Sequence, residues 1–474
     1  MKDTPVTFHL SSDEFRDTAQ IELKRWLART PLAFFSVPAP NSGIAGKFAP
    51  ARTAIARGFF DHAPALTDAA RGHRSFIRCW GATVKNWLTH FLSGVFGIAL
   101  LFAASSDSAT AHRGGQIRQY YIAADELDWD YMPSGTDMMM GMPGMPATGY
   151  AKFFLQRGPH MIGHIYHKAI YREYTDATFK HLKPRSADQA YLGMLGPIIR
   201  AEVGDTIQIT FKNNGTHPYS MHPHGVLYEK SSEGALYNDG VAGGDKGGDV
   251  VAPGHTYNYV WQVPERAGPG PSDPSSVVWL YHSHVNERKD VNSGLVGAIT
   301  VTRRGMARPD GTPKDVQREF VNLYMVFDES QSWFIDYNIK KFTSDPTHVD
   351  QTQVIQKDFE NHFDFFIGQG TAIQNFRLTI NGYQYANMPM MTMNKGQHVR
   401  WYLITLGEAF NFHTPHWHGN TVLVNGQRTD VVAISPAQMT TADMVPDDPG
   451  IWLFHCHVSD HMDGGMVARY QVNP

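Results

Sequence analysis

Cysteine is scarce in this chain of 474 residues, which contains only Cys79 and Cys456. If Cys456 binds a metal and Cys79 lies in a removed leader, no disulfide framework is possible, and burial of a hydrophobic core must supply the stability. A large excess of either charge is also lacking, because the formal net charge is −4. The chain therefore has no basic footprint for nucleic acid, and we expect no nucleic-acid partner.

An apolar run long enough to span a bilayer is lacking as well. The stretch from Phe91 to Ala104 has about 14 residues, a length typical of the core of a signal peptide. Lys85 precedes it, and Ala109-Thr110-Ala111 follows as a small-x-small cleavage pattern. We predict a signal peptide over residues 84–111 and export to the periplasm or the extracellular space, with an uncleaved anchor as the alternative. Residues 1–83 are an unassigned extension. Either the translation start has been placed too early in the gene, or these residues are a disordered segment.

Histidine is abundant, and its most informative occurrence is His455-Cys456-His457, followed by His461 and Met466. Alternate residues of a strand point to opposite faces, so the two histidines face one way and the cysteine the other. A cysteine, two histidines and a weak axial methionine form the ligand set of a blue-copper, or type 1, electron-transfer site. His413 supplies the second nitrogen of that set.

Four His-x-His pairs accompany this site. They are His222 and His224, His282 and His284, His416 and His418, and His455 and His457. A single pair on a strand is usually a surface feature, but eight imidazoles are the number needed for a three-copper cluster that reduces dioxygen. Zinc is the main rival, yet structural zinc favours four closed, often cysteine-rich ligands. The pattern therefore favours copper.

Short apolar segments between Gly, Pro, Asn and Asp predict the strands of β-sandwiches. These segments are Thr206–Phe211, Val277–Tyr281, Val296–Val301, Val399–Leu403 and Ile451–Phe454. The two halves of the chain also repeat each other. Superposing them matches all four His-x-His pairs, whereas His413 falls on Tyr219, Cys456 on Ser283, His461 on Arg288 and Met466 on Ser293. Only the second half can therefore hold a type 1 site.

The chain from Tyr120 to its C-terminus resembles the ceruloplasmin and hephaestin branch of the multicopper oxidases. The resemblance rests on runs such as Tyr120–Trp129, Tyr171–Asp176, Glu202–Asp205, Lys230–Tyr237, Gly268–Pro274 and Asp290–Gly294. It implies an all-β fold with two cupredoxin-like Greek-key β-sandwich domains after the leader, over residues 112–305 without type 1 copper and 306–474 with it. An architecture of two domains rather than six is similar to that of the small laccases. This similarity implies a homotrimer with each three-copper cluster between neighbouring subunits.

The resemblance also implies four coppers per active unit. The type 1 ligands would be His413, Cys456, His461 and Met466; the type 2 ligands His222 and His416; and the ligands of the type 3 pair His224, His282, His284, His418, His455 and His457. Electrons from a reducing substrate would enter at type 1 copper and reduce O2 to water. Asp239 matches a proton-relay acid of the family, although an Asp before Gly is also common in turns.

The donor substrate is the weakest part of the pattern. Asp460 matches an iron ligand of the ferroxidases, but two further iron ligands fall on Ile373 and Leu378, and Glu360 or Asp364 would have to replace them. We therefore expect a laccase-like oxidase of phenolic or aromatic donors, with a ferroxidase as the alternative.

Three other possibilities remain. The composition of the methionine-rich segment Met138–Met145 favours a flexible Met and Gly loop, with copper recruitment or cuprous oxidation as the alternative. A copper-binding or electron-transfer protein without oxidase turnover is opposed by the complete set of eight histidines. A copper nitrite reductase is opposed because that family has its type 1 site in the first domain, where this chain has Ser283.

Overall fold

The computed structural model describes residues 115–141, 149–159, 161–241, 243–345 and 376–474. The expected leader, the extension before it, and Cys79 lie outside these residues, as do Ile373, Glu360 and Asp364. Of the helices in the described ranges, none has the length and hydrophobicity needed to cross a membrane.

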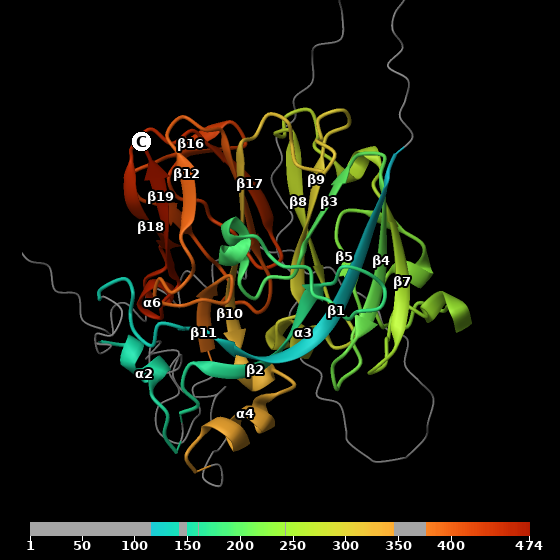
Figure 1. Cartoon of the computed structure of the whole chain (residues 1–474), viewed down its shortest axis with the longest axis horizontal. Coiled ribbons are helices and arrows are strands. Elements are labelled where there is room, and N and C mark those ends of the chain that lie inside the picture. The colour runs from blue at the N-terminus through green and yellow to red at the C-terminus, as the bar shows by residue number, and fades with distance from the viewer. Residues whose placement is uncertain (1–114, 142–148, 160, 242, 346–375) are drawn as a thin grey trace, which may run out of the picture. The chain divides into compact units, whose positions relative to one another are not determined.

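Two sheets form the first half of the fold (Figure 1). The larger has the strand order β2-β1-β4-β7-β6, and the smaller has the order β3-β9-β8-β5. Their bounds are β1 Ile117–Asp130, β2 Ile165–Glu173, β3 Ile198–Glu202, β4 Thr206–Asn213, β5 His222–Pro223, β6 Leu227–Tyr228, β7 Thr256–Gln262, β8 Ser276–His282 and β9 Val296–Thr302. Non-consecutive neighbours in both sheets require crossovers, as in a Greek-key sandwich.

The second half repeats this order and adds one edge strand, β16, to its larger sheet. Its sheets run β11-β10-β13-β17-β15-β16 and β12-β19-β18-β14. The bounds are β10 Arg318–Asp328, β11 Phe376–Ile380, β12 Met391–Asn394, β13 Val399–Thr405, β14 Pro415–Trp417, β15 Val422–Val424, β16 Gln427–Thr429, β17 Met439–Met444, β18 Gly450–Cys456 and β19 Val467–Asn473. The all-β fold with two cupredoxin-like sandwiches is confirmed. The domain limits at residues 305 and 306 stay a prediction.

The helices in the described ranges are short and lie between strands. They are α2 Ala151–Leu155, η1 Ala187–Leu192, η2 Lys230–Ser232, η3 Gly243–Lys246, η4 Glu265–Ala267, α3 Glu287–Ser293, η5 Glu329–Gln331, α4 Ile335–Phe342 and α6 Ser459–Asp463. Helix α3 follows β8 and helix α6 follows β18, so these two helices occupy equivalent places in the repeat.

Hydrophobic patterning explains the layers. In β4 the buried residues Ile207, Ile209 and Phe211 alternate with half-buried polar ones, so one face of the strand packs on the core. Strands β9 and β13 are buried at every position and lie within their sheets. The five strand segments expected from the sequence coincide with β4, β8, β9, β13 and β18.

Polar contacts join the two halves across β8. Tyr402 on β13 has its hydroxyl 2.7 Å from Oγ of Ser276, and the Arg400 guanidinium donates to the hydroxyls of Ser275 and Ser276 at 2.7 and 2.6 Å. Asp443 on β17 neutralises Arg400 through a 2.6 Å ion pair. Burial of these groups has a desolvation cost, which their hydrogen bonds and the ion pair offset, and the same contacts hold the halves in one arrangement.

Candidate metal centres

Three donor atoms converge in the second half. Nδ1 of His413 lies 3.1 Å from Nδ1 of His461, and Sγ of Cys456 lies 3.9 and 3.6 Å from these two nitrogens. All three side chains are buried. Since a first-row divalent ion lies roughly 2.0 Å from nitrogen and 2.3 Å from sulfur ligands, the space between the three atoms fits one such ion.

Local backbone structure holds this donor set. Cys456 is the last residue of β18, and its amide donates to the carbonyl of Met466 at 3.1 Å. The Met466 amide in turn donates to the carbonyl of His461, on α6, at 2.9 Å. Met466 is fully buried. The loop from β18 through α6 to β19 therefore brings the cysteine, the histidine and the methionine together.

Two further residues orient the donors, and sequence reasoning missed both. Oδ1 of Asn411 lies 3.1 Å from Nε2 of His413, so this ring presents Nδ1 toward Cys456. The amide of Thr414 donates to Sγ of Cys456 at 3.3 Å. The only sign of these roles in the sequence is proximity to His413, because Asn411 precedes it by two residues and Thr414 follows it directly. Such outer contacts orient metal ligands in proteins.

Burial controls the protonation of this centre. It lowers the pKa of His461 to about 4, despite the opposing charge of Asp460, and it lowers the pKa of His413 well below its usual value. Both imidazoles are therefore neutral ligands at physiological pH. Burial raises the pKa of the Cys456 thiol, so a cation is needed to stabilise the thiolate there.

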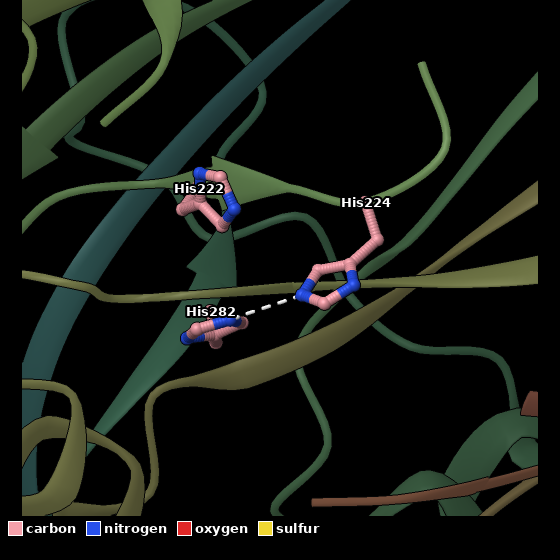
Figure 2. Close-up of side chains that lie close together, drawn as sticks. All are labelled: His222, His224 and His282. Atoms are coloured by element: carbon pink, nitrogen blue, oxygen red, sulfur yellow. Dashed lines mark hydrogen bonds between the residues drawn. The ribbon is translucent and has the colours of Figure 1, made fainter. Parts of the chain in front are cut away.

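Four histidines gather in the first half and form what we call the first quartet. The register of β5 and β8 sets His222 opposite His282. Figure 2 shows His222, His224 and His282 facing a common space, with Nε2 of His224 3.2 Å from Nε2 of His282. His284 completes the group, with its ring centroid 5.2 Å from that of His222.

The second quartet is built in the same way. The pairing of β14 with β18 sets His416 opposite His455, and Nε2 of His418 lies 3.0 Å from Nε2 of His455. The ring of His457 lies 5.3 Å from that of His416. His455 and His457 are therefore in the quartet while Cys456 between them faces the other centre, as strand alternation predicts.

Backbone carbonyls orient four of these eight rings through Nδ1. The pairs are His222 with Glu233 at 2.7 Å, His282 with Ser283 at 3.1 Å, His416 with Asp430 at 2.9 Å and His455 with Cys456 at 2.8 Å. A carbonyl can only accept, so Nδ1 carries the proton and Nε2 keeps its lone pair for a metal. Burial also lowers the pKa of His224 to about 4 and that of His282 well below its usual value.

The two quartets remain separate within one chain. In the described ranges, no ring contact and no group of candidate ligands combines a histidine of the first quartet with one of the second. Each quartet has three histidines whose donor atoms lie within 4.8 Å of one another. The eight imidazoles expected for one cluster are therefore present as two half-sites.

The candidate acid Asp239 lies between two lysines. Its carboxylate is 2.7 Å from Nζ of Lys230 and 2.8 Å from Nζ of Lys246, and these contacts hold its pKa well below the usual range. Lys230 also pairs with Glu233, whose carbonyl accepts from His222. Asp239 is therefore connected to the first quartet through a chain of polar contacts rather than directly.

The residues considered for the donor substrate occupy different settings. Asp460 is half-buried on α6, next to His461. Leu378, at one position expected for an iron ligand, is fully buried in β11. In the methionine-rich segment, the Met138 amide donates to the carbonyl of Tyr385 at 3.0 Å. Residues 142–145 of that segment lie outside the described ranges.

Comparisons with known proteins agree with this arrangement. Family models described as "Multicopper oxidase" match residues 189–305 and residues 343–474, together just over half of the chain. The chain belongs to the multicopper oxidase family, whose members bind copper.

Several curated relatives are similar over most of this chain. "Ferroxidase HEPHL1" of Homo sapiens is 42% identical over 362 residues, which cover 76% of this chain and 30% of the relative. "Hephaestin" of Rattus norvegicus is 39% identical over 76% of this chain and 30% of its own length. "Ceruloplasmin" of Homo sapiens is 36% identical over 83% of this chain and 36% of its own length. The chain thus spans about a third of the length of these relatives.

Proposed function

We propose that this protein oxidises a donor one electron at a time and reduces dioxygen to water with bound copper. One observation carries the proposal: Cys456, the last residue of β18, lies in the centre formed with His413 and His461, while the histidines on either side of it both lie in the second quartet. The tripeptide thus supplies a short covalent path between an electron-entry site and a half-cluster.

The ligand assignments of the proposal follow from the residues that converge. His413, Cys456 and His461, with Met466 as axial donor, would hold type 1 copper. His222 and His416 would hold type 2 copper, and the other six histidines of the quartets would hold the type 3 pair. Copper supplies the one-electron and dioxygen chemistry when bound.

The protein's own residues prepare these sites. The carbonyls of Glu233 and Asp430 fix the protonated nitrogen of His222 and His416, so that both rings enter the site in the binding tautomer. Burial of the type 1 donors excludes water from the thiolate. Rigid, dry ligands reduce the reorganisation that each electron transfer requires.

We also propose that the active unit is a homotrimer. The separation of the two quartets in one chain supports a cluster assembled from the first quartet of one subunit and the second quartet of its neighbour. Closed rings of identical subunits arise from such head-to-tail interfaces. Dioxygen would bind at this shared site.

For the donor we propose ferrous iron, which replaces the expectation of a laccase-like phenol oxidase as the main choice. The relatives' names favour it, because the relative with 42% identity is named a ferroxidase. Asp460, next to His461, supplies the hard oxygen ligand that iron prefers. Iron would then be oxidised beside the type 1 ligands, where one short transfer reaches Cys456.

A phenolic or aromatic donor remains the second candidate, and two observations favour it. Phe412, directly before His413, is 59% exposed and offers an aromatic docking surface at the type 1 centre. Leu378 supplies no ligand where the resemblance expects one. Oxidation of Cu⁺ is a further option. The amide of Met138 donates to the carbonyl of Tyr385, and the amide of Tyr385 donates to the carbonyl of Gly465, next to Met466, so backbone hydrogen bonds link the start of the methionine-rich segment to the type 1 ligands.

Proton delivery and export complete the proposal. Asp239 is the proposed relay acid, but its two lysine partners keep the carboxylate charged, so a relay would require Lys230 or Lys246 to move away. We propose export through a signal peptide at residues 84–111, and domain limits of 112–305 and 306–474.

Steady-state kinetics of copper-loaded protein with Fe²⁺, a phenol and Cu⁺ under air would test the donor. Asp460→Asn removes the charge that a hard cation needs and keeps a hydrogen-bond acceptor. For a ferroxidase we expect kcat/KM for Fe²⁺ to fall by about tenfold or more, equivalent to about 1.4 kcal/mol, with phenol oxidation little changed. The matched variant Asp463→Asn, at the other end of α6, serves as the control. Slow Fe²⁺ turnover in the wild type beside fast phenol turnover would reverse the choice of donor.

A further inference from the structure

A cleft away from the histidines lies between the first half, the loop that includes η1, and the segment connecting the two halves. Its volume is about 980 Å³, within the usual size range of small-molecule sites. One wall comes from β1, β2 and β3, another from residues 182–193, and a third from residues 308–319. A ligand here would contact the sandwich of the first half and the start of β10 together.

Arginine dominates the polar lining of this cleft. Six cationic side chains face four acidic ones: Arg172, Lys183, Arg185, Arg200, Arg308 and Arg318 against Glu173, Asp188, Asp310 and Glu319. The lining therefore carries a net charge of +2. A concave surface with one sign of charge concentrates ions of the opposite sign.

Four of the six cations are already neutralised by carboxylates. The ion pairs are Lys183 with Glu173, Arg200 with Glu319 and Arg318 with Asp188, each at 2.8 Å, and Arg172 with Asp125 at 3.5 Å. These pairs form a rigid rim and leave little charge for a ligand.

Arg185 and Arg308 are different, because within the described ranges neither has a carboxylate within ion-pair distance. Arg185 donates to the carbonyls of Gly193 and Leu195. Arg308 donates to carbonyls of its own segment, including Val316 at 3.1 Å, and to the hydroxyl of Thr312. Carbonyls fix the position of a guanidinium without neutralising its charge, so both guanidinium groups are prepositioned. The two terminal nitrogens of Arg185 make one hydrogen bond each and retain unused N–H donors, whereas those of Arg308 make four and leave only its Nε–H for a ligand.

The remaining lining is apolar and aromatic. Trp129, Tyr191, Leu182, Leu192 and Ile198 contribute to the walls. A fully hydrated inorganic ion would leave this surface unused, whereas an organic molecule could cover it. Planar guanidinium groups match the geometry of carboxylate and phosphate oxygens.

We propose that this cleft binds a small organic oxyanion with at least two negative charges, a polycarboxylate or a phosphate ester, with Arg185 as its principal hydrogen-bond partner and Arg308 as a second positive charge. The site is separate from the copper chemistry, and its failure would leave the proposed oxidase function intact. Because the walls come from both sides of the connecting segment, a bound anion stabilises the folded arrangement of that segment by mass action.

Calorimetric titration of the full copper-loaded chain tests this site, with citrate and inorganic phosphate as probes and sodium chloride at equal ionic strength as the blank. We expect saturable citrate binding, a rise in Tm with citrate, and weaker phosphate binding because phosphate leaves the apolar walls uncovered. Equal affinity for the two probes would contradict the organic part of the proposal. The absence of saturable binding of either probe up to 10 mM, on the order of the weakest useful affinity, would overturn the site.

Variants locate the binding. Arg185→Gln is expected to weaken citrate binding by about tenfold or more, whereas Arg428→Gln, the same charge change at an exposed position of the edge strand β16 in the second half, leaves the affinity unchanged. Because Arg308 also supports its own segment, Gln189→Glu is the second probe of the cleft. It adds a negative charge to the lining without removing a contact of either arginine, and it should weaken binding in the same direction. Equal citrate affinity in wild type, Arg185→Gln and Gln189→Glu would place the binding elsewhere.

Discussion

The candidate type 1 centre of the second half has a counterpart in the first half, built on the same scaffold. Thr414 donates its amide to Sγ of Cys456 at 3.3 Å, and Ser220 donates its amide to Oγ of Ser283 at 3.0 Å. In the first half, the hydroxyl of Ser283 in turn donates a hydrogen bond to the carboxylate of Asp290 at 2.7 Å. The counterpart is therefore a closed hydrogen-bond network.

The difference lies in what satisfies the buried polar atoms. Asp290 also accepts from the indole of Trp333 at 2.8 Å, so its carboxylate is well partnered although it is buried. In the second half, the two Nδ1 atoms of His413 and His461 and the sulfur of Cys456 face one another. Lone pairs that face each other in a dry site repel unless a cation lies between them. At this position the same fold thus accommodates either a hydrogen-bond network or a metal ion.

Removal of the thiol should have the largest effect on this comparison. Cys456→Ser is expected to abolish the blue charge-transfer band and to reduce donor oxidation by more than about a hundredfold, since a change in an outer contact alone costs about 10- to 100-fold at metal sites. Absorption spectra and copper content measure the two effects. Ser283→Cys is the matched change in the first half and should produce no blue band, because Tyr219 and Asp290 leave no histidine donors there. A blue Cys456→Ser protein would contradict the assignment.

Mixing two inactive variants tests whether the quartets combine between subunits. His224→Gln damages the first quartet and His418→Gln the second, so each homotrimer should be inactive. In trimers reassembled from equal amounts, about one interface in four pairs two intact quartets, and oxidase activity should return to roughly that fraction. Co-expressed chains with separate tags allow the hybrids to be isolated. Hybrids as inactive as their parents would favour a cluster within one chain.

Disruption of the network in the first half should destabilise the protein by a smaller amount. Asp290→Ala leaves Ser283 and the indole of Trp333 without their buried acceptor, which costs about 2–4 kcal/mol. Denaturant midpoints of the copper-loaded chain measure this loss. Asp290→Asn keeps one acceptor oxygen and should lose less. Equal stability of Asp290→Ala and wild type would show that the network is not a structural replacement for a metal.

The smallest expected effect concerns pH and the outer strands of the two sandwiches. In the first half, His167 on β2 lies 3.0 Å from Asp128 and 3.5 Å from Glu126. In the second half, the equivalent outer strands β10 and β11 pair apolar residues such as Val326 and Leu378. Burial alone would lower the pKa of His167, but the two carboxylates raise it above its usual value.

The raised pKa determines the sign of the pH effect. The stabilisation is complete below the unfolded pKa of about 6.5 and is lost as the pH rises through the higher folded value. His167→Gln should remove this dependence, with a change of at most about 1 kcal/mol for a half-exposed pair. Melting temperatures from pH 6 to 8 would measure it, with His255→Gln, an exposed histidine without a carboxylate partner in the described ranges, as the control. A Tm difference between wild type and His167→Gln that grows from pH 6 to pH 8 would contradict the sign.

The sequence by itself determined the fold class and the ligand candidates. Strand alternation requires Cys456 and its flanking histidines to face opposite sides, and this rule of local geometry holds wherever the strand lies. The internal repeat likewise predicted which half lacks the type 1 donors, because Ser283 cannot replace a thiolate whatever its environment.

Tertiary structure alone decided the contacts between segments that are distant in the chain. Asn411 and Asp290 acquire their roles from partners that strand pairing and packing bring close, and no spacing rule predicts such partners. The separation of the quartets also depends on how the two sandwiches meet across β8 and β13. The arginine cleft arises only where residues 182–193 and 308–319 approach the same wall, because net charge along a sequence does not reveal which arginines fold beside a carboxylate and which do not.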